Sequence, residues 1–325
     1  MMRALLAQHG LTLIELMIAM TLGLVIMLIT TGLLLSSKAA YISQNQIATV
    51  QESGRYAVQL VSRAIRQSAY PPINETGTQL LLPAETAAGI AGRDAMTLKK
   101  TSAGLQSATS NDAVNDSDIL ALGYFGNGME GKAGDMINCA GLVVPGVNGD
   151  ETLESQRSWS IFFVARDSAG EPELRCKYRT ENGWNADAVV RGVESFQVLY
   201  GIDASGDGIP DYFINASMVD SLDQRLPLAG HNAAERALDL QRHTYWKKVR
   251  AIRFSLLMRG SEYARDDALT DVHDLFGSEY SALFSATDKG VQIDEKRLPA
   301  KEKNRIRKIF SKTVYLRNAP EGGAQ

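Results

Sequence analysis

The 325-residue sequence is poor in the residue types that metal centres and disulfide frameworks need. It has two cysteines, four histidines and three tryptophans. Two cysteines are too few for a zinc ribbon and allow at most one disulfide, and the histidines form no HExxH pattern. The formal net charge is −3, from 34 basic and 37 acidic side chains, so bulk charge does not favour binding to polyanions.

Motifs that would indicate catalysis are also missing. We find no GxSxG turn, no Walker loop and no GxGxxG following a predicted strand. We therefore expect a protein that is not an enzyme and that requires no cofactor.

The amino-terminal part carries one long apolar run. Leu11 to Leu35 contains a single charged residue, Glu15, and about 20 apolar residues suffice for a helix to span a bilayer. The run is too long for the apolar core of a secretory signal, and no A-x-A cleavage pattern follows it. A short leader that ends at Gly10 precedes it instead. A carboxylate inside such a run is costly and usually marks function.

The junction from Gly10 to Leu16 resembles the class III leader of type IV pilins and pseudopilins. Leu11 stands where phenylalanine is commonest in that family. The resemblance implies that prepilin peptidase removes residues 1–10, cutting between Gly10 and Leu11, and that the new amino group of Leu11 is methylated. It also implies that Glu15 acts in filament assembly, whereas the alternative is a chance carboxylate near the membrane interface. A carboxylate in apolar surroundings needs a cationic partner, and the Leu11 amine of a neighbouring subunit would supply one.

The helical pattern continues beyond the apolar run. Small or apolar residues recur every three or four positions and predict one buried face made by Ile47, Val50, Gly54, Ala57, Val61 and Ala64. Pro71 and Pro72 predict an end near Tyr70. We expect one helix over 11–70, about 55 residues and 80 Å long, with a transmembrane half at about 11–35 and an amphipathic half that packs on a head.

The remainder of the chain, 71–325, predicts a β-rich head. Runs of strand-forming residues bounded by turn residues lie at 118–124, 158–165, 173–179, 193–200, 247–258 and 308–316. Alternation along 247–258 predicts a sheet with one covered face. One long helix followed by antiparallel strands predicts an α+β fold.

The two cysteines, Cys139 and Cys176, allow two structural interpretations. If the head lies outside the cytoplasmic membrane, its compartment is oxidising and favours a disulfide between them. Free buried thiols are the alternative. A redox site is disfavoured because neither cysteine belongs to a C-x-x-C motif.

The segment 201–212 has the pattern of the first half of a calcium loop. Oxygen-bearing residues at alternate positions precede a glycine, and a ligand set would consist of Asp203, Ser205, Asp207, the Ile209 carbonyl and Asp211. Ile214 occupies the position where an EF-hand needs a bidentate glutamate, which disfavours an EF-hand. A looser calcium site and a solvated turn between two strands both remain open.

Later segments make the resemblance more specific. In chain order they are similar to segments of the PilW family of minor pilins: Cys139-Ala140-Gly141, Leu174-Arg175-Cys176, 192–212, 246–259 and 307–318. This likeness implies a subunit that primes type IV pilus assembly at the filament tip and supports twitching motility and adhesion. It implies a single pass through the bacterial inner membrane, a periplasmic head and later incorporation into the pilus.

The same resemblance implies the partners. These are other minor pilins, the major pilin, prepilin peptidase, the inner-membrane assembly machinery and a tip adhesin. A tip pseudopilin of type II secretion is the alternative within the class. The alternative of another class is a membrane-anchored module that binds DNA or a surface, since ten basic and three acidic residues lie between Lys289 and Arg317. Aromatic residues for base stacking are sparse there, which disfavours nucleic acid.

Overall fold

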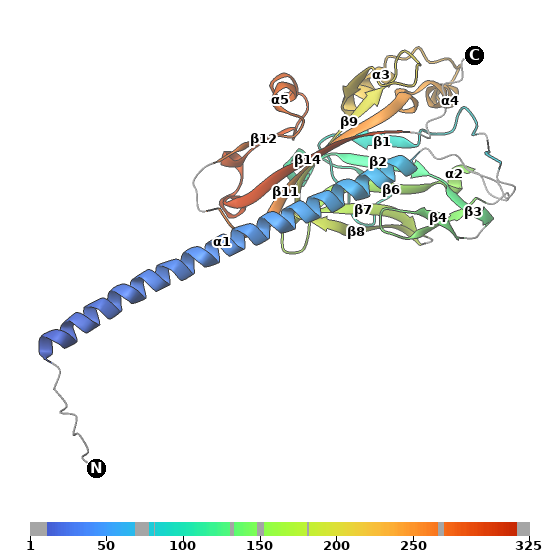
Figure 1. Ribbon diagram of the computed structural model, residues 1–325. Helices are drawn as coiled ribbons and strands as arrows, with labels where there is room; N and C mark the ends of the chain where they lie inside the picture. Colours follow the sequence, from blue (N-terminus) through green and yellow to red (C-terminus); the bar gives the residue numbers. More distant parts are fainter. Residues whose placement is uncertain are drawn as a thin grey trace.

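The computed structural model describes residues 12–68, 78–80, 82–130, 133–147, 153–180, 182–265 and 270–316. A single long helix projects from a head built mainly of antiparallel strands, which confirms the predicted α+β class (Figure 1). The predicted cleavage pair, Gly10 and Leu11, lies outside the described residues.

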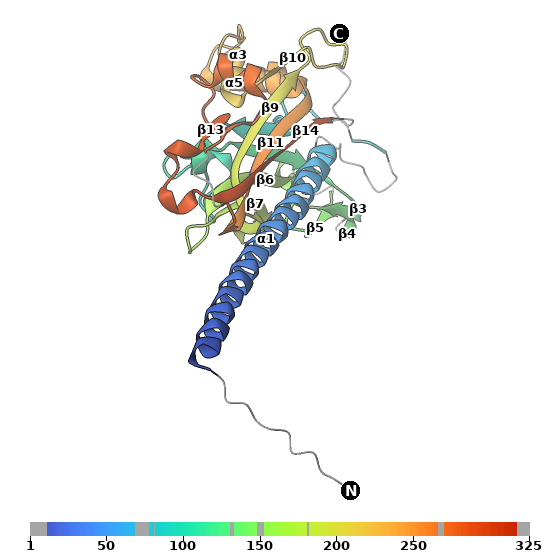
Figure 2. The ribbon, with the colours of Figure 1, turned by 60° about the vertical axis from the view of Figure 1, so that its left-hand side comes forward.

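Helix α1 spans Leu13–Gln67, a length of 55 residues. It begins with a capping box, in which Thr12 is the N-cap and Glu15 occupies the third helical position. It ends before the predicted Tyr70, because Ser68 is already extended and its N–H caps the carbonyls of Ala64 and Ile65. Only the second half of the helix packs on the head (Figure 2).

The buried face of α1 differs from the predicted one at several positions. Ile47 is 42% exposed, whereas Gln46 beside it is 4% exposed. Ser62, which is not among the residues of the predicted buried face, is also buried. The buried stripe is wider than one row of residues because α1 contacts strands of two sheets. Gln46 can be buried because the head supplies hydrogen-bond donors to its side chain.

Two antiparallel sheets form most of the head. The larger has the order β1-β2-β6-β7-β8, with bounds Ile90–Arg93, Ile119–Tyr124, Ser158–Arg166, Pro172–Thr180 and Gly183–Arg191. The smaller has the order β10-β9-β11-β14, with bounds Tyr212–Ile214, Val193–Ile202, Val249–Tyr263 and Arg305–Tyr315. The six predicted strands are present as β2, β6, β7, β9, β11 and β14.

One apolar core joins the two sheets and α1. Val61 and Ile65 of α1 are fully buried in it, together with Phe162 of β6 and Phe254 of β11. Because these residues come from all three elements, the second half of α1 is part of the core of the head.

The smaller sheet is covered on both faces, which corrects the prediction of one covered face. Leu257 of β11 and Ile309 of β14 pack on its outer side against Leu275, Ile293 and Leu298. These last three belong to a layer that holds β12 (Val272–Asp274), α5 (Ser278–Phe284) and β13 (Gln292–Asp294). The alternation along β11 failed as a guide because small and polar residues such as Ser255 are buried beneath this layer.

The remaining elements are short and were not predicted. A three-stranded sheet has the order β3-β5-β4, with bounds Gly126–Glu130, Val143–Gly146 and Ala133–Ile137. The other helices are α2 (Leu153–Gln156), α3 (Ala216–Asp223) and α4 (Ala233–His243). Single 3-10 turns are η1 (Leu105–Ser107), η2 (Val114–Asp116), η3 (Tyr245–Lys248), η4 (Glu295–Arg297) and η5 (Ala300–Glu302).

Candidate functional site

The carboxylate of Glu15 lies at the very start of α1. Its Oε2 atom accepts hydrogen bonds from the backbone N–H of Thr12 at 3.0 Å and from the Thr12 hydroxyl at 2.9 Å. In return, the N–H of Glu15 donates to the Thr12 Oγ1 atom at 3.3 Å. The capping box therefore fixes the negative charge of Glu15 beside the first turn of the helix, bonded to Thr12, which follows Leu11 in the sequence.

The first half of α1 is an apolar rod without a protein partner in the monomer. Among the described residues, α1 is the one helix long and apolar enough to cross a membrane, and none of its most apolar window is buried against the head. Leu28 and Leu34, for example, are 72% and 70% exposed. A surface of this kind is unfavourable in water and requires lipid or other helices around it.

Gln46 marks the place where α1 meets the head. Its Oε1 atom accepts from the backbone N–H of Ser261 at 2.9 Å and of Glu262 at 3.4 Å. About two helical turns further along, Gly54 faces Phe310 of β14 so closely that a Cβ atom would lie 2.3 Å from the ring. These contacts position the rod relative to the sheet.

A disulfide joins Cys139 and Cys176, with their Cα atoms 5.7 Å apart. The structure thus shows the first of the two arrangements that the sequence left open. Cys176 lies in the middle of β7, and Cys139 belongs to the turn that follows β4. The bond ties the small three-stranded sheet to the core of the head.

The late basic residues do not form one free surface. The Arg307 side chain is fully buried between Glu194, at 2.5 Å, and Glu295, at 3.2 Å. Arg305 pairs with Glu171 at 3.2 Å. Burial alone lowers the pKa of Arg307, but the bonds and charges of Glu194 and Glu295 outweigh it and raise that pKa above its usual value. Both guanidinium groups are therefore engaged and not available to phosphates.

The structure brings together several residues of the predicted calcium loop. Asp203 accepts from the N–H groups of Gly206 at 2.6 Å and Gly208 at 2.9 Å, and from Arg250 at 3.3 Å. Burial raises the pKa of Asp203, but these hydrogen bonds and the Arg250 charge outweigh burial, so the pKa lies below its usual value. The carboxylate is thus held ionised by the loop itself.

The other acidic residues of the loop also accept backbone hydrogen bonds. Asp211 accepts from Ala204 at 2.7 Å and Ser205 at 3.0 Å, and Asp207 accepts from Ile209 at 2.9 Å. Within the part of the chain that the structure describes, no group of three or more His, Cys, Asp or Glu side chains is arranged to hold a metal ion. Calcium binding by Asp203, Ser205, Asp207, Ile209 and Asp211 stays a prediction.

Three interacting carboxylates, of which Asp118 and Asp288 are buried and Asp94 is half-buried, were not predicted. Asp118 accepts from the N–H groups of Ala95 and Val198, and burial together with the charges of Asp94 and Asp288 raises its pKa well above the usual range. These three aspartates are far apart in the sequence and belong to no shared motif. Nothing in the one-dimensional pattern indicates that the fold brings them together.

Two family comparisons match this chain. The family described as prokaryotic N-terminal methylation motif matches residues 5–31, and the family described as Type IV Pilus-assembly protein W matches residues 161–318. The first match covers Gly10, Leu11 and Glu15. The second covers the chain from within β6 to the end of β14, which includes the whole smaller sheet but not β1 and β2 of the larger one.

Comparisons with individual proteins are weaker. Among the solved structures, a type IV-like pilin from Thermus thermophilus, TTHA1219, is similar over 83% of this chain and 96% of its own, with 11% sequence identity and a TM-score of 0.39. None of the curated proteins matches. The two family matches, on a chain with a capped apolar α1 and a β-rich head, show that this protein belongs to the PilW family of type IV pilus-assembly proteins.

Proposed function

We propose that this protein is a minor pilin that acts in the tip or priming complex of a type IV pilus. Membership of the PilW family supports a role in pilus assembly, and pilins are structural subunits rather than catalysts. In this role the chain works with other minor pilins and the major pilin, and it supports pilus biogenesis, twitching motility and adhesion, in part by presenting a tip adhesin.

The observation that carries the proposal is the form of α1. Its first half is apolar and unburied, whereas its second half belongs to the core of the head. Such a helix anchors the head to a membrane and, when the chain leaves the membrane, offers the same apolar surface to neighbouring helices. We propose that about 11–35 spans the inner membrane and that the head lies in the periplasm.

Maturation follows from the junction at the start of α1. In the proposal, prepilin peptidase removes residues 1–10 and the amino group of Leu11 is methylated. This reaction places a cationic amine one residue before Thr12, whose N–H is already bonded to Glu15. Because an unpaired carboxylate is costly in apolar surroundings, Glu15 then pairs with the amine of an adjacent subunit and sets the axial register.

A complementation experiment tests the assembly role. A deletion strain of the source bacterium receives the wild-type chain, Glu15→Gln or Glu52→Gln, and surface pili and twitching are measured. Glu52 is an exposed carboxylate on the same helix and serves as the matched control. We expect Glu15→Gln to lose pili and Glu52→Gln to retain them. Normal piliation with Glu15→Gln would refute the proposed role of this carboxylate.

A further inference from the structure

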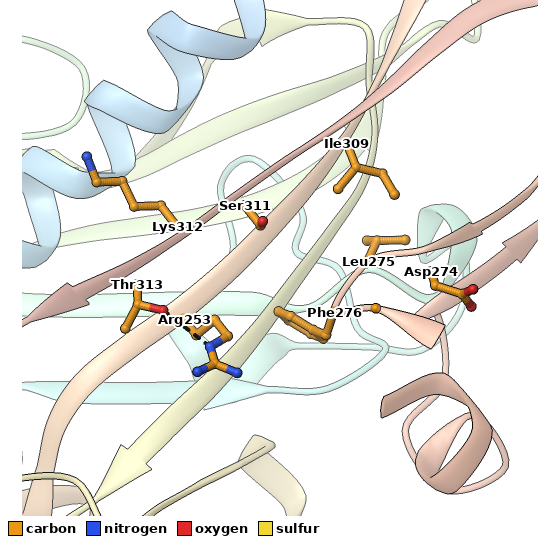
Figure 3. Close-up of a pocket in the computed structure, with 9 residues that line it drawn as sticks. Arg253, Asp274, Leu275, Phe276, Ile309, Ser311, Lys312 and Thr313 are labelled. Carbon is orange, nitrogen blue, oxygen red and sulfur yellow. Dashed lines mark hydrogen bonds between the residues drawn. The ribbon is translucent and has the colours of Figure 1, made fainter. Parts of the chain in front are cut away.

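A polar pocket of about 490 Å³ opens on the outer face of the smaller sheet. Its floor consists of β11 and β14, and its wall is the segment that follows β12 (Figure 3). The floor contributes Arg253, Ile309, Ser311 and Thr313, and the wall contributes a short run, Asp274 to Gly277. The proposed assembly features of the chain, on α1, make no use of this pocket.

The guanidinium group of Arg253 is held in place but is not neutralised. Its Nε atom donates to the Thr313 hydroxyl at 3.2 Å, and its Cζ atom lies 4.2 Å from the centre of the Phe213 ring. Among the described residues, no carboxylate forms an ion pair with it, and its two terminal nitrogens make no hydrogen bond. A stacked, oriented guanidinium with two free nitrogens matches the two oxygens of a carboxylate.

A second polar group beside the pocket is also unsatisfied. Ser255 lies on the same face of β11 as Arg253 and pairs in register with Ser311 of the pocket floor. Its side chain is completely buried, and its hydroxyl has no hydrogen-bond partner among the described residues. An unpaired buried hydroxyl costs about 1–3 kcal/mol. A bound acceptor would reach Arg253 but not this hydroxyl, because Ser255 is completely buried and does not line the pocket.

The acidic residue of the wall does not neutralise Arg253. Asp274 accepts a hydrogen bond from Gln292 at 2.8 Å and makes no ion pair with Arg253. Leu275 and Phe276 lie between the two, so the pocket has a cationic end, an apolar middle and a polar far end (Figure 3). A side chain with an apolar stem and a terminal carboxylate has the matching order of groups.

We propose that this pocket binds the carboxylate of an acidic side chain on another protein chain. Three features favour a protein over a small molecule. The pocket is lined mostly by polar groups, whereas small-molecule sites are mostly apolar. It lies along β14, which has one strand neighbour among the described residues. The same strand exposes Tyr315, on the same face as Ser311 and Thr313, and tyrosine is a residue type that often anchors protein interfaces.

The α1 rod leaves this face accessible. Phe310 faces Gly54 of α1, and successive residues of a strand point to opposite sides of the sheet. Ser311 therefore faces away from the helix, toward the pocket. The inference goes beyond the proposed assembly function, because it concerns a contact of the head and holds whether or not the chain is processed at Gly10.

A peptide titration tests the inference on the full-length protein in detergent micelles. The probe is the peptide Thr-Val-Glu-Val-Thr-amide with rhodamine on its amino terminus. Its fluorescence anisotropy is followed as the protein is added, and the unlabelled, acetylated peptide then serves as competitor up to about 10 mM. Its neutral match carries Gln in place of Glu. The variants are Arg253→Gln, Arg253→Lys and, as a control, Lys308→Gln, which removes the same charge from an exposed position of β14.

We expect the Glu peptide to bind and the Gln peptide to bind at least about tenfold more weakly, as expected for loss of a charge-assisted pair. Arg253→Gln should lower affinity by a similar factor, Arg253→Lys by less, and Lys308→Gln by less than about twofold. Thermal melts of each variant verify the fold. No binding, equal binding of the two peptides, or undiminished binding by Arg253→Gln would overturn the inference. Displacement by succinate at the same concentration as by unlabelled Glu peptide would show that the site accepts any small carboxylate, and would overturn the assignment to a protein chain.

Discussion

Gly54 of α1 and Phe310 of β14 touch so closely that no side chain fits between them. A Cβ atom built on Gly54 would lie 2.3 Å from the nearest carbon of the Phe310 ring. The glycine sits where the helix crosses the edge strand of the smaller sheet. The distance between the rod and the sheet is therefore set by this pair.

The first prediction concerns this contact. Gly54→Ala forces the Phe310 ring to move and should lower the free energy of unfolding by about 1–2 kcal/mol, since overpacking outweighs the gain in helix propensity. Gly23→Ala is the matched control, because nothing lies within 4 Å of a Cβ atom there. Denaturant unfolding in micelles measures both. Equal stability of the two variants would contradict the packing role of Gly54. Adding Phe310→Leu to the Gly54→Ala variant should restore part of the lost stability.

The second prediction concerns the disulfide. Removing it with the double change Cys139→Ser and Cys176→Ser should lower the stability of the head by about 2–4 kcal/mol, because the unfolded chain regains the freedom of the closed loop. The thiols are buried in the core, so each serine also loses apolar contacts. Thermal unfolding of the wild type with and without reductant checks the result. An unchanged melting temperature on reduction would show that the bond contributes little.

The third prediction separates buried from exposed arginines. Arg307→Gln leaves Glu194 and Glu295 buried without their cation and should cost about 3–5 kcal/mol. Arg297→Gln, in a pair whose arginine is 88% exposed, should cost less than about 1 kcal/mol. Urea unfolding of both variants makes the comparison. Similar small losses would mean that the buried network around Arg307 adds no stability to the head.

The fourth prediction is a pH dependence. The Lys177 ammonium donates to the carbonyls of Lys99 at 2.7 Å and Lys100 at 3.0 Å, and burial lowers its pKa from 10.5 to about 8. Between pH about 8 and pH 10.5, the Lys177 side chain holds its proton in the unfolded chain but has released it in the folded chain. Stability relative to a variant without this group should therefore rise as the pH increases from about 8 to about 10.5, and stay level below 8.

The comparison between wild type and Lys177→Met isolates this effect from other titrating groups. Unfolding free energies of both proteins are measured across that pH range. The difference between them should shift in favour of the wild type as the pH rises. A difference that is flat, or that shifts toward Lys177→Met, would show that Lys177 titrates normally in the folded state.

The sequence predicted the parts of the fold that depend on local pattern. The apolar run from Leu11 to Leu35, the helix that continues it and six strands all follow from periodicity and turn residues. Strands such as β8 were missed, because Gly183–Arg191 mixes small and charged residues that only the neighbouring strand orders. Short elements supported by tertiary contacts carry too little local signal.

Features that depend on distant contacts were predicted poorly. From the sequence, Gln46 is expected to be a surface residue of the helix. It is buried because the backbone N–H groups of Ser261 and Glu262 donate hydrogen bonds to its side chain. From the sequence alone, Arg305 and Arg307 belong to a basic segment without obvious partners. They are engaged because Glu171 and Glu194, which are distant in the sequence, lie beside them. The predicted pair of cysteines was found joined, but the sequence alone left free thiols open.

The central claim is that α1 belongs to a processed pilin. The most direct measurement is the intact mass and amino-terminal sequence of the protein from cells with and without prepilin peptidase, with Gly10→Ala as the blocked variant and Gly23→Ala as the matched control. We predict peptidase-dependent loss of residues 1–10 and an N-methylated Leu11 in the wild type and in Gly23→Ala, with no processing of Gly10→Ala. An unprocessed amino terminus in both strains would contradict the account and leave a head anchored to the membrane by an uncleaved helix.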